Sequence, residues 1–274
     1  MKVGIVAIPL EADVVASTLS GIVSLSRTPA ALLRRGRRGE MDVWLISCGV
    51  GPVNGALATS ALLERERPDL VVSCGSAGAL AADLRPGEVV VASSVAFHDH
   101  GHYVGDHLVS TGIPLPPGRG GRLRDLQLGE PWRSRIEAFL ANHPGRFHVG
   151  RVVTGAQTVF SERTRAAIRQ RTGALAVDME SAAVAYTATL WGVPWLIVRG
   201  ISDLADEPTG RGLASLVTYT AELDRSPGLR SRVGRVMRHP GALWRARRIR
   251  QAMREATRRA ADVLWSLVMP NLAG

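Results

Sequence analysis

The sequence predicts an α/β fold in which helices cover both faces of a sheet. Over the first two hundred residues, short apolar runs alternate with segments of helical periodicity, and this alternation is typical of strands connected by helices. Hydrophobic residues make up 46% of the 274 positions, enough for a full core. The sequence shows no linker, internal repeat or low-complexity tract. We therefore expect one domain over residues 1–240 and a basic C-terminal helix over 241–274, packed on that domain.

The predicted strands are short runs rich in valine and isoleucine, the pattern of buried strands. They span residues 3–8, 42–48, 70–74, 88–97, 147–154, 174–177 and 194–201. We expect the third strand to end at the small residues 75–78, because glycine interrupts strands.

Helical patterns fill most of the intervals between these strands. They span residues 11–19, 53–65, 132–142, 161–170 and 180–191. Ser161 is a candidate N-cap, with Glu162 in the first turn behind it. Residues 110–122 are rich in glycine and proline and are predicted to form a loop.

The net charge of +10 is a local feature of the chain. Residues 225–259 hold 12 arginines and one acid, a net of +11, and the rest holds 34 − 12 = 22 basic and 24 − 1 = 23 acidic residues. Within 241–269, apolar residues recur at helical spacing. This pattern fits a terminal helix packed on the sheet, or a basic helix over 241–268 in weak contact with an anionic membrane surface. We favour packing, and we expect no nucleic-acid partner because aromatic residues are scarce in the arginine-rich run.

Composition also bears on the compartment. Cys48 and Cys74 each end an apolar run, where a buried free thiol is the ordinary outcome. Acidic residues interrupt the N-terminal apolar run, and no window approaches the roughly 20 apolar residues of a membrane span. We expect a cytoplasmic protein.

Several polar residues stand where predicted strands end, which is where open α/β sheets usually bind ligands. Glu11 follows the first strand and could be a general base or an acid favoured by a helix N-terminus. Small residues at 75–78 would let a ligand approach the backbone, or form a plain turn. Residues 49–55 partly match a dinucleotide fingerprint, but Asp69 precedes the next strand where an acid should end it. We therefore expect a tight turn and no nicotinamide cofactor.

The richest strand ends are residues 177–181 and 198–203. The second delivers Arg199, Ser202 and Asp203 from one apolar strand, which is unusual for a purely structural edge, although an Arg–Asp ion pair is the plain alternative. Histidines 98, 100 and 102 with Asp99 could suggest a metal. Nothing else in the sequence reinforces that interpretation, and we expect no metal.

Together these segments resemble the superfamily of methylthioadenosine/S-adenosylhomocysteine nucleosidases and purine nucleoside phosphorylases. The most specific stretches are residues 172–183, with Val-Asp-Met-Glu-Ser at their centre, and residues 198–206, with Arg-Gly-Ile-Ser-Asp. The 75–78 turn and the first strand with Glu11 stand in the expected order. The resemblance spans residues 1–208 and implies a three-layer sandwich with a mixed central sheet, assembled as a homodimer or larger.

The resemblance also implies roles on the nucleoside. Met179 would pack under the ribose, and Glu180 would accept hydrogen bonds from its hydroxyls. Asp203 would protonate N7 of the base, which makes the purine a better leaving group, and Ser202 would orient Asp203. Backbone groups of Val159 would hold the base edge.

On the nucleophile side, the resemblance implies that Glu11 binds and polarises the attacking water. Ser76 would lie beside that water, and Arg199 would order the acidic groups. Phosphorylases of this superfamily offer arginines to phosphate, one of them just before the glycine–serine turn, where this chain has Ser73. A dianion without arginine partners would be weakly held, so we expect water.

The expected function is therefore hydrolysis of the N-glycosidic bond of a 5′-substituted adenine nucleoside, with release of adenine and no cofactor. Thr158 stands where the thioether nucleosidases usually carry a phenylalanine on the base. The run from Val233 to Leu264 resembles tails of hopanoid-associated nucleosidase/phosphorylase-like proteins, which implies an adenosylated lipid as an alternative substrate. A phosphate-dependent phosphorylase and a non-catalytic nucleoside-binding module are further alternatives.

Overall fold

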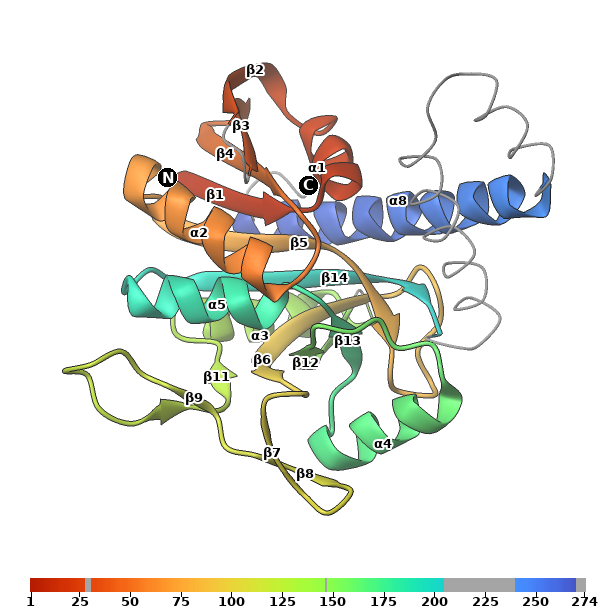
Figure 1. The fold of residues 1–274 in the computed structure, drawn as a ribbon. Coiled ribbons are helices and arrows are strands. Elements are labelled where there is room, and N and C mark those ends of the chain that lie inside the picture. Colours follow the sequence, from red (N-terminus) through yellow and green to blue (C-terminus); the bar gives the residue numbers. More distant parts are fainter. Residues whose placement is uncertain (28–30, 146, 205–239, 270–274) are drawn as a thin grey trace, which may run out of the picture.

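The computed structural model describes residues 1–27, 31–145, 147–204 and 240–269 (Figure 1). The predicted C-terminal segment 241–274 therefore falls outside the described residues at its last five positions. The part of the basic run before residue 240 also falls outside them.

A ten-stranded mixed sheet forms the centre of the molecule. Its order is β11-β6-β12-β13-β5-β1-β4-β3-β2, and β14 pairs with both β5 and β6. Parallel and antiparallel pairs both occur at its centre, where β14 runs parallel to β5 and antiparallel to β6, so the predicted α/β class with a mixed sheet is confirmed. The strands are β1 (Lys2–Ala7), β2 (Ser20–Arg27), β3 (Ala31–Arg38), β4 (Met41–Cys48), β5 (Leu70–Ala79), β6 (Val89–Phe97), β11 (Leu126–Gln127), β12 (His148–Thr154), β13 (Ala176–Asp178) and β14 (Trp195–Asp203).

Part of the sheet closes on itself. β14 lies between β5 and β6, β6 continues to β12 and β13, and β13 returns to pair with β5. Five strands thus form a ring, and β1, β4, β3 and β2 extend outward from β5. Closure removes free edges from this part of the sheet.

Helices cover both faces, as predicted (Figure 1). α2 and α5 pack against each other on one face, while α8 lies on the other against β14, β5 and α1. The helices are α1 (Pro9–Ala16), α2 (Pro52–Glu66), α3 (Trp132–Asn142), α4 (Glu162–Thr172), α5 (Ser181–Leu190) and α8 (Pro240–Val268). The predicted cap of α4 is present, since Thr164 N donates to Ser161 Oγ.

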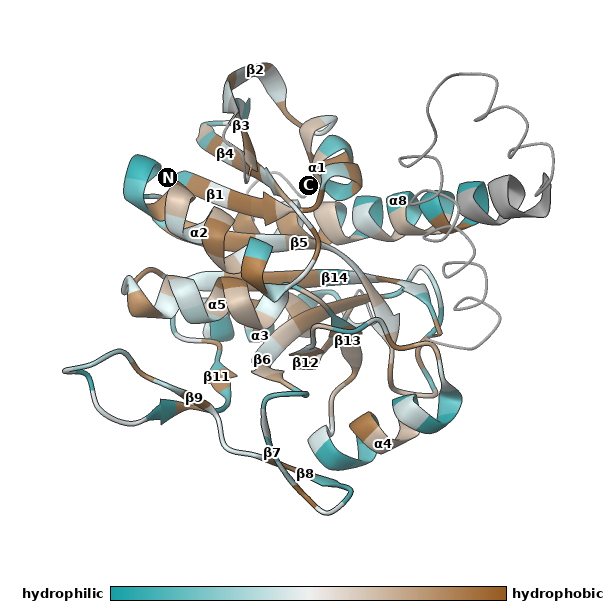
Figure 2. Ribbon diagram, viewed as in Figure 1, coloured by the Kyte–Doolittle hydropathy of each residue, from teal (hydrophilic) through white to brown (hydrophobic). Residues whose placement is uncertain are grey.

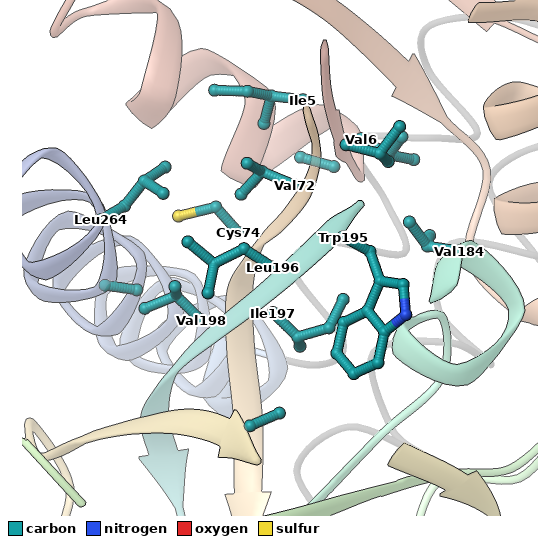
Figure 3. Packing of buried hydrophobic residues seen from close by; sticks show 14 of the residues in the cluster. Ile5, Val6, Val72, Cys74, Val184, Trp195, Leu196, Ile197, Val198 and Leu264 are labelled. Carbon is teal, nitrogen blue, oxygen red and sulfur yellow. The ribbon is translucent and has the colours of Figure 1, made fainter. Parts of the chain in front are cut away.

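β14 shows how both faces are buried. Leu196 and Val198 point toward Leu264 of α8, while Trp195 and Ile197 point toward α5 (Figure 3). All five side chains are buried. Successive strand residues face opposite sides, so a strand buried on both faces reads as one continuous apolar run, which is why the sequence revealed it.

Two predictions about loops and strand ends were wrong, and two hairpins were missed. β5 continues through residues 75–79, because β14 and β13 pair with that segment on its two sides and hold it extended. Residues 110–122 include β9 (Ile113–Pro114) and the first residue of its partner β10 (Arg122–Leu123). The hairpins β2–β3 and β7–β8 (Gly101–Val104, His107–Ser110) were not predicted.

The second half of α8 is a core element. Ala256, Ala260 and Leu264 are fully buried, and a side chain at Gly200 of β14 would overlap the Ala256 carbonyl, so glycine there lets the helix approach closely. Figure 2 shows hydrophilic residues along the exposed side of α8. No described helix is long and apolar enough to cross a bilayer.

Candidate active site

Four segments bring polar and charged side chains together beside the second half of β5. α1, which follows β1, carries Glu11, β5 carries Ser76, and β14 carries Arg199. The junction of β13 and α5 carries Asp178 and Glu180. β14 runs parallel to β5 and β13 runs antiparallel to it, so pairing with β5 brings residues far apart in sequence together here.

Arg199 lies at the centre of this cluster, 1% exposed. Its Nε is 2.7 Å from Asp178 Oδ2 and donates to Ser181 Oγ at 3.0 Å. Its Nη2 donates to Ser73 Oγ at 2.7 Å, and its Nη1 lies 3.8 Å from Glu11 Oε2. A planar guanidinium contacted on several nitrogens is fixed in orientation, so Arg199 sets where the surrounding acids lie.

Asp178 is held as firmly as the arginine it pairs with. Thr154 Oγ1 donates to Asp178 Oδ1 at 2.6 Å, and Ser181 contributes both its backbone N–H and its hydroxyl. Thr154 Oγ1 also accepts from the backbone N–H of Ala182, in the first turn of α5. The network therefore joins the ends of β12, β13 and β14 to the start of α5.

Glu11 points toward the middle of β5. Its Oε1 accepts from Ser76 N at 2.8 Å and from Ser76 Oγ at 2.7 Å. A side chain at Gly75 would overlap Glu11 Oε2 and Arg199 Nη1, so glycine is needed there. Burial raises the pKa of Glu11, against the opposing effects of Arg199 and the Ser76 hydrogen bonds. The carboxylate is thus fixed in place and more basic than usual.

Glu180 is bound from the opposite side by the 49–55 turn. Its Oε1 accepts from Gly51 N at 2.8 Å. Gly51 has φ 102°, a conformation that favours glycine. Burial, reinforced by the charge of Asp178, raises the pKa of Glu180 to about 8. This environment therefore favours the protonated form of the carboxyl.

The balance of buried charges explains why the pKa values of Glu11 and Glu180 are both raised. Glu11, Asp178 and Glu180 are three buried acids around a single buried guanidinium, and Asp178 forms the closest ion pair with it. Burying an unpaired charge is costly, so the remaining acids are favoured in their neutral forms. A ligand that carries or develops positive charge would be stabilised here.

Asp203 ends β14 on the far side of β5. Gly78 of β5 is the register partner of both Asp203 on β14 and Val177 on β13. Neighbouring strands lie about 4.8 Å apart, so Asp203 stands roughly 10 Å from the backbone of β13. Ser202 Oγ contacts Asp203 Oδ2 at 2.7 Å and Ala77 O at 3.3 Å. Asp203 and Glu180 thus follow strands on opposite sides of β5.

The other predicted residues lie around this edge. Met179 is half-buried between Asp178 and Glu180, while the Val159 side chain packs in a small apolar cluster with Leu80 and Val177. Thr158 is exposed beside Val159. The role of the Val159 backbone on the base stays a prediction.

Sequence reasoning missed four contributors: Ser73, Thr154, Asp178 and Gly51. Asp178 was noted only as an acid at a strand end, and Ser73 only as a missing arginine. Their partners lie far along the chain: Thr154 and Asp178 are 24 residues apart, Ser73 and Arg199 are 126 apart, and Gly51 and Glu180 are 129 apart. The only local signal was a polar residue inside or ending an otherwise apolar strand.

The histidine segment supports a loop of this edge. Asp99 Oδ2 accepts from Ala156 N at 2.7 Å, and Arg171 donates to the His98 carbonyl at 2.9 Å. Burial lowers the pKa of His98, which favours the neutral form of its ring. Within the described ranges, no group of three or more His, Cys, Asp or Glu side chains could hold a metal ion.

Comparison with known proteins adds a family to this geometry. Residues 3–226 match the family model of the phosphorylase superfamily. A 5′-methylthioadenosine/S-adenosylhomocysteine nucleosidase of Staphylococcus saprophyticus is 32% identical over 200 residues, covering 70% of this chain and 79% of the relative. The enzyme of the same name from an Exiguobacterium species is 34% identical over 180 residues, covering 63% and 72%.

Solved structures share the fold at lower identity. An S-adenosylhomocysteine nucleosidase from Streptococcus pyogenes, in complex with 5-methylthiotubericidin, aligns with a TM-score of 0.73 at 23% identity, covering 99% of this chain and 97% of that one. A futalosine hydrolase of Helicobacter pylori aligns with a TM-score of 0.72 at 19% identity, covering 98% and 97%. One fold therefore serves more than one nucleoside.

Proposed function

Since the chain belongs to the phosphorylase superfamily, we propose that it hydrolyses the N-glycosidic bond of a 5′-substituted adenine nucleoside and releases adenine. The observation that carries the proposal is the pairing of two differently held acids across β5. Glu11 is bound by Ser76 and faces Arg199, and Asp203 is bound by Ser202. A base on one side and an acid on the other are what this cleavage requires.

In the proposed reaction, Glu11 accepts a proton from a water molecule held beside Ser76. The water oxygen bonds to C1′ of the ribose as the bond from C1′ to N9 of the base breaks. Asp203 gives its proton to N7, so the base leaves as neutral adenine. A raised pKa suits Glu11 to this work, because a stronger base removes the proton more readily near neutral pH.

Glu180 would act on the sugar. The ribose gains positive charge as the glycosidic bond breaks, and a nearby carboxylate stabilises that charge in a site from which water is excluded. The raised pKa of Glu180 means that its ionised form is disfavoured until such a charge develops. We propose that Met179, next to it, packs against the ribose, and that backbone groups of Val159 hold the base.

Water is the proposed nucleophile rather than phosphate. Ser73, where phosphorylases of this superfamily offer an arginine, is buried and accepts a hydrogen bond from Arg199. Arg199 is itself committed to Asp178. Within the described part of this cluster, no second arginine is left for a dianion.

The relatives guide the choice of substrate. Both nucleosidases compared above carry methylthioadenosine and adenosylhomocysteine in their names, so we propose a nucleoside of that type. None of the proteins compared above is hopanoid-associated, and an adenosylated lipid stays a second candidate that rests on the tail sequence alone.

We further propose that the chain works as a homodimer in the cytoplasm. Val50, Val53 and Leu57 leave an apolar stripe at the start of α2, with Val53 70% exposed. Such a stripe is costly in water and is covered when two copies pair. Two buried free cysteines suit a reducing compartment. Light scattering of the purified protein would test the dimer.

The decisive experiment is a phosphate-free incubation with methylthioadenosine, adenosylhomocysteine, adenosine and inosine, followed by detection of the free base. We expect adenine from the first two. The Asp203→Asn variant should lose about 10²–10⁴-fold in kcat with an unchanged circular dichroism spectrum, whereas Asp83→Asn, at an exposed acid, should be unaffected. Strict dependence on phosphate would overturn the hydrolase, and full turnover by Asp203→Asn would overturn the mechanism.

A further inference from the structure

The proposed reaction does not involve the most strongly charged part of the chain. Six arginines lie between residues 247 and 259 of α8, whereas residues 247–268 contain two acids, Glu255 and Asp262. Six more arginines precede them between residues 225 and 245. The family model ends at residue 226, so the match to the superfamily does not account for this charge.

Four of these arginines form a line on α8. Residues 247, 250, 254 and 258 are spaced by three and four positions, which places them on one face of a helix. We call Arg247, Arg250, Arg254 and Arg258 the arginine stripe. All four are exposed, and at 1.5 Å per residue the stripe is about 17 Å long.

Within the described residues, most of the stripe has no acidic partner. Arg258 shares Glu255 with Arg259, at 3.1 and 3.0 Å. Among the described residues, Arg247, Arg250 and Arg254 have no hydrogen bond or ion pair. Figure 1 shows the first turns of α8 extending past the edge of the sheet. Its charge is therefore directed to something outside the described body.

The apolar face of α8 is already occupied. Ala256, Ala260, Val263, Leu264 and Leu267 are buried against the domain. In the described part of the helix, these residues are unavailable to enter a bilayer. Any attraction exerted by the stripe is electrostatic and does not require insertion.

We propose that the arginine stripe binds the anionic surface of a phospholipid membrane by charge alone. Cations bind a flat anionic surface when they lie in one plane. The guanidinium groups of the stripe form a straight, exposed line on a helix that projects from the body, so they can meet this condition. Each arginine near such a surface adds a comparable increment of binding, which disappears beyond a Debye length.

A membrane surface fits the stripe better than a nucleic acid. Single-stranded nucleic acids are held by aromatic side chains on which bases stack, and no aromatic residue stands between Arg247 and Arg258. Reading a duplex requires a helix that can enter a groove, whereas Ala256, within the span of the stripe, and Ala260, one turn further on, are buried, so the helix exposes only one face here.

The test is sedimentation of the full chain with vesicles. We expect binding to vesicles of mixed phosphatidylcholine and phosphatidylglycerol, and none to pure phosphatidylcholine. Raising the ionic strength from about 0.1 M to about 1 M should release the protein, since the Debye length falls from about 10 Å to about 3 Å. The triple variant Arg247→Gln, Arg250→Gln, Arg254→Gln should bind about 100-fold more weakly.

A matched variant separates the stripe from net charge. Arg119→Gln, Arg124→Gln, Arg163→Gln removes the same charge from exposed positions on the body and should bind like the wild type. Both triple variants should keep wild-type turnover of methylthioadenosine if the proposed function holds, and vesicle binding does not depend on that result. Equal losses in the two variants, binding to neutral vesicles, or tighter binding to a DNA or RNA duplex than to anionic vesicles would overturn the proposal.

Discussion

Arg199 and the arginine stripe put the same side chain to two opposite uses. Arg199 is 1% exposed and contacts Asp178, Ser181, Ser73 and Glu11. The stripe consists of exposed arginines, three of which have no partner among the described residues. Around Arg199 a single charge is fixed in position, whereas the arginines of the stripe project together from one face of α8.

The difference shows how burial decides what an arginine contributes. Where water is excluded, removing one partner of an ion pair strands the other, and the loss is large. Where water is present, each pair is screened and contributes little alone, so only the sum over several charges matters. The predictions below test this contrast from its largest expected effect to its smallest.

The largest effect should come from Asp178→Asn. The asparagine amide would bring N–H donors toward the guanidinium of Arg199 and leave its charge without its closest partner. We expect the free energy of unfolding to fall by about 3–5 kcal/mol in chemical denaturation. The matched variant Glu255→Gln removes an exposed partner of two arginines on α8 and should cost less than about 1 kcal/mol. Equal losses of stability in the two variants would show that burial does not distinguish the two ion pairs.

The second prediction concerns space at the buried centre. Gly75→Ala places a methyl group against Glu11 Oε2 and Arg199 Nη1. Such overpacking typically costs about 1–3 kcal/mol, and the displaced Glu11 should lower kcat. Gly129→Ala, where a side chain would meet nothing within 4 Å, is the control. If Gly75→Ala unfolds and turns over like Gly129→Ala, the close fit around Arg199 is not required.

The third prediction is a dependence on pH. The pKa of Glu180 is raised from 4.5 to about 8, so between these values the folded protein holds a proton that the unfolded chain has released. The free energy of unfolding should therefore fall as pH rises through this window, by at most about 1.4 kcal/mol per pH unit from this group. Glu11 contributes with the same sign.

Denaturant titrations at several pH values would measure this slope. Glu180→Gln should flatten it, whereas Glu137→Gln, at an exposed position on α3, should not. A slope that Glu180→Gln leaves unchanged would show that the carboxyl does not carry the buried proton.

The smallest effect is expected for a single member of the stripe. Arg254→Gln removes an exposed charge with no partner among the described residues. It should change the free energy of unfolding by no more than about 0.5 kcal/mol, as measured by thermal and chemical denaturation. A loss above about 2 kcal/mol would mean that Arg254 is a structural residue like Arg199.

The elements predicted most closely are those whose local pattern and packing agree. α3 has its predicted bounds, and α8 spans Pro240–Val268, within one residue of the apolar periodicity at 241–269 but shorter than the helix predicted over 241–274, whose last five positions lie outside the described residues. The β2–β3 hairpin was missed because β3 carries Arg34, Arg35, Arg37 and Arg38, which hide the alternation of a strand. β5 was predicted to be too short, since its pairing through Gly75 depends on strands distant in sequence.

The residues of the candidate site also divide into those that the sequence predicted and those that it did not. Glu11, Ser76 and Arg199 were expected near one another on the basis of a resemblance, and the structure brings them together. The hydroxyls of Ser73 and Thr154 could not be assigned from local sequence, because each completes a contact between separate strands. Which polar residue faces Arg199 is decided by strand order, and the sequence pattern does not encode strand order directly.

The insertion of β14 between β5 and β6 also determines when this molecule can become complete during synthesis. Arg199 meets Ser73 across 126 residues of chain, so a growing chain displays β5 and β6 with unpaired edges until residues 195–203 leave the ribosome. Contacts this distant form slowly, and open edges invite association with other chains. The enzyme's assembly therefore depends on protection of a half-built ring, and its acids can meet only after most of the polypeptide has been made.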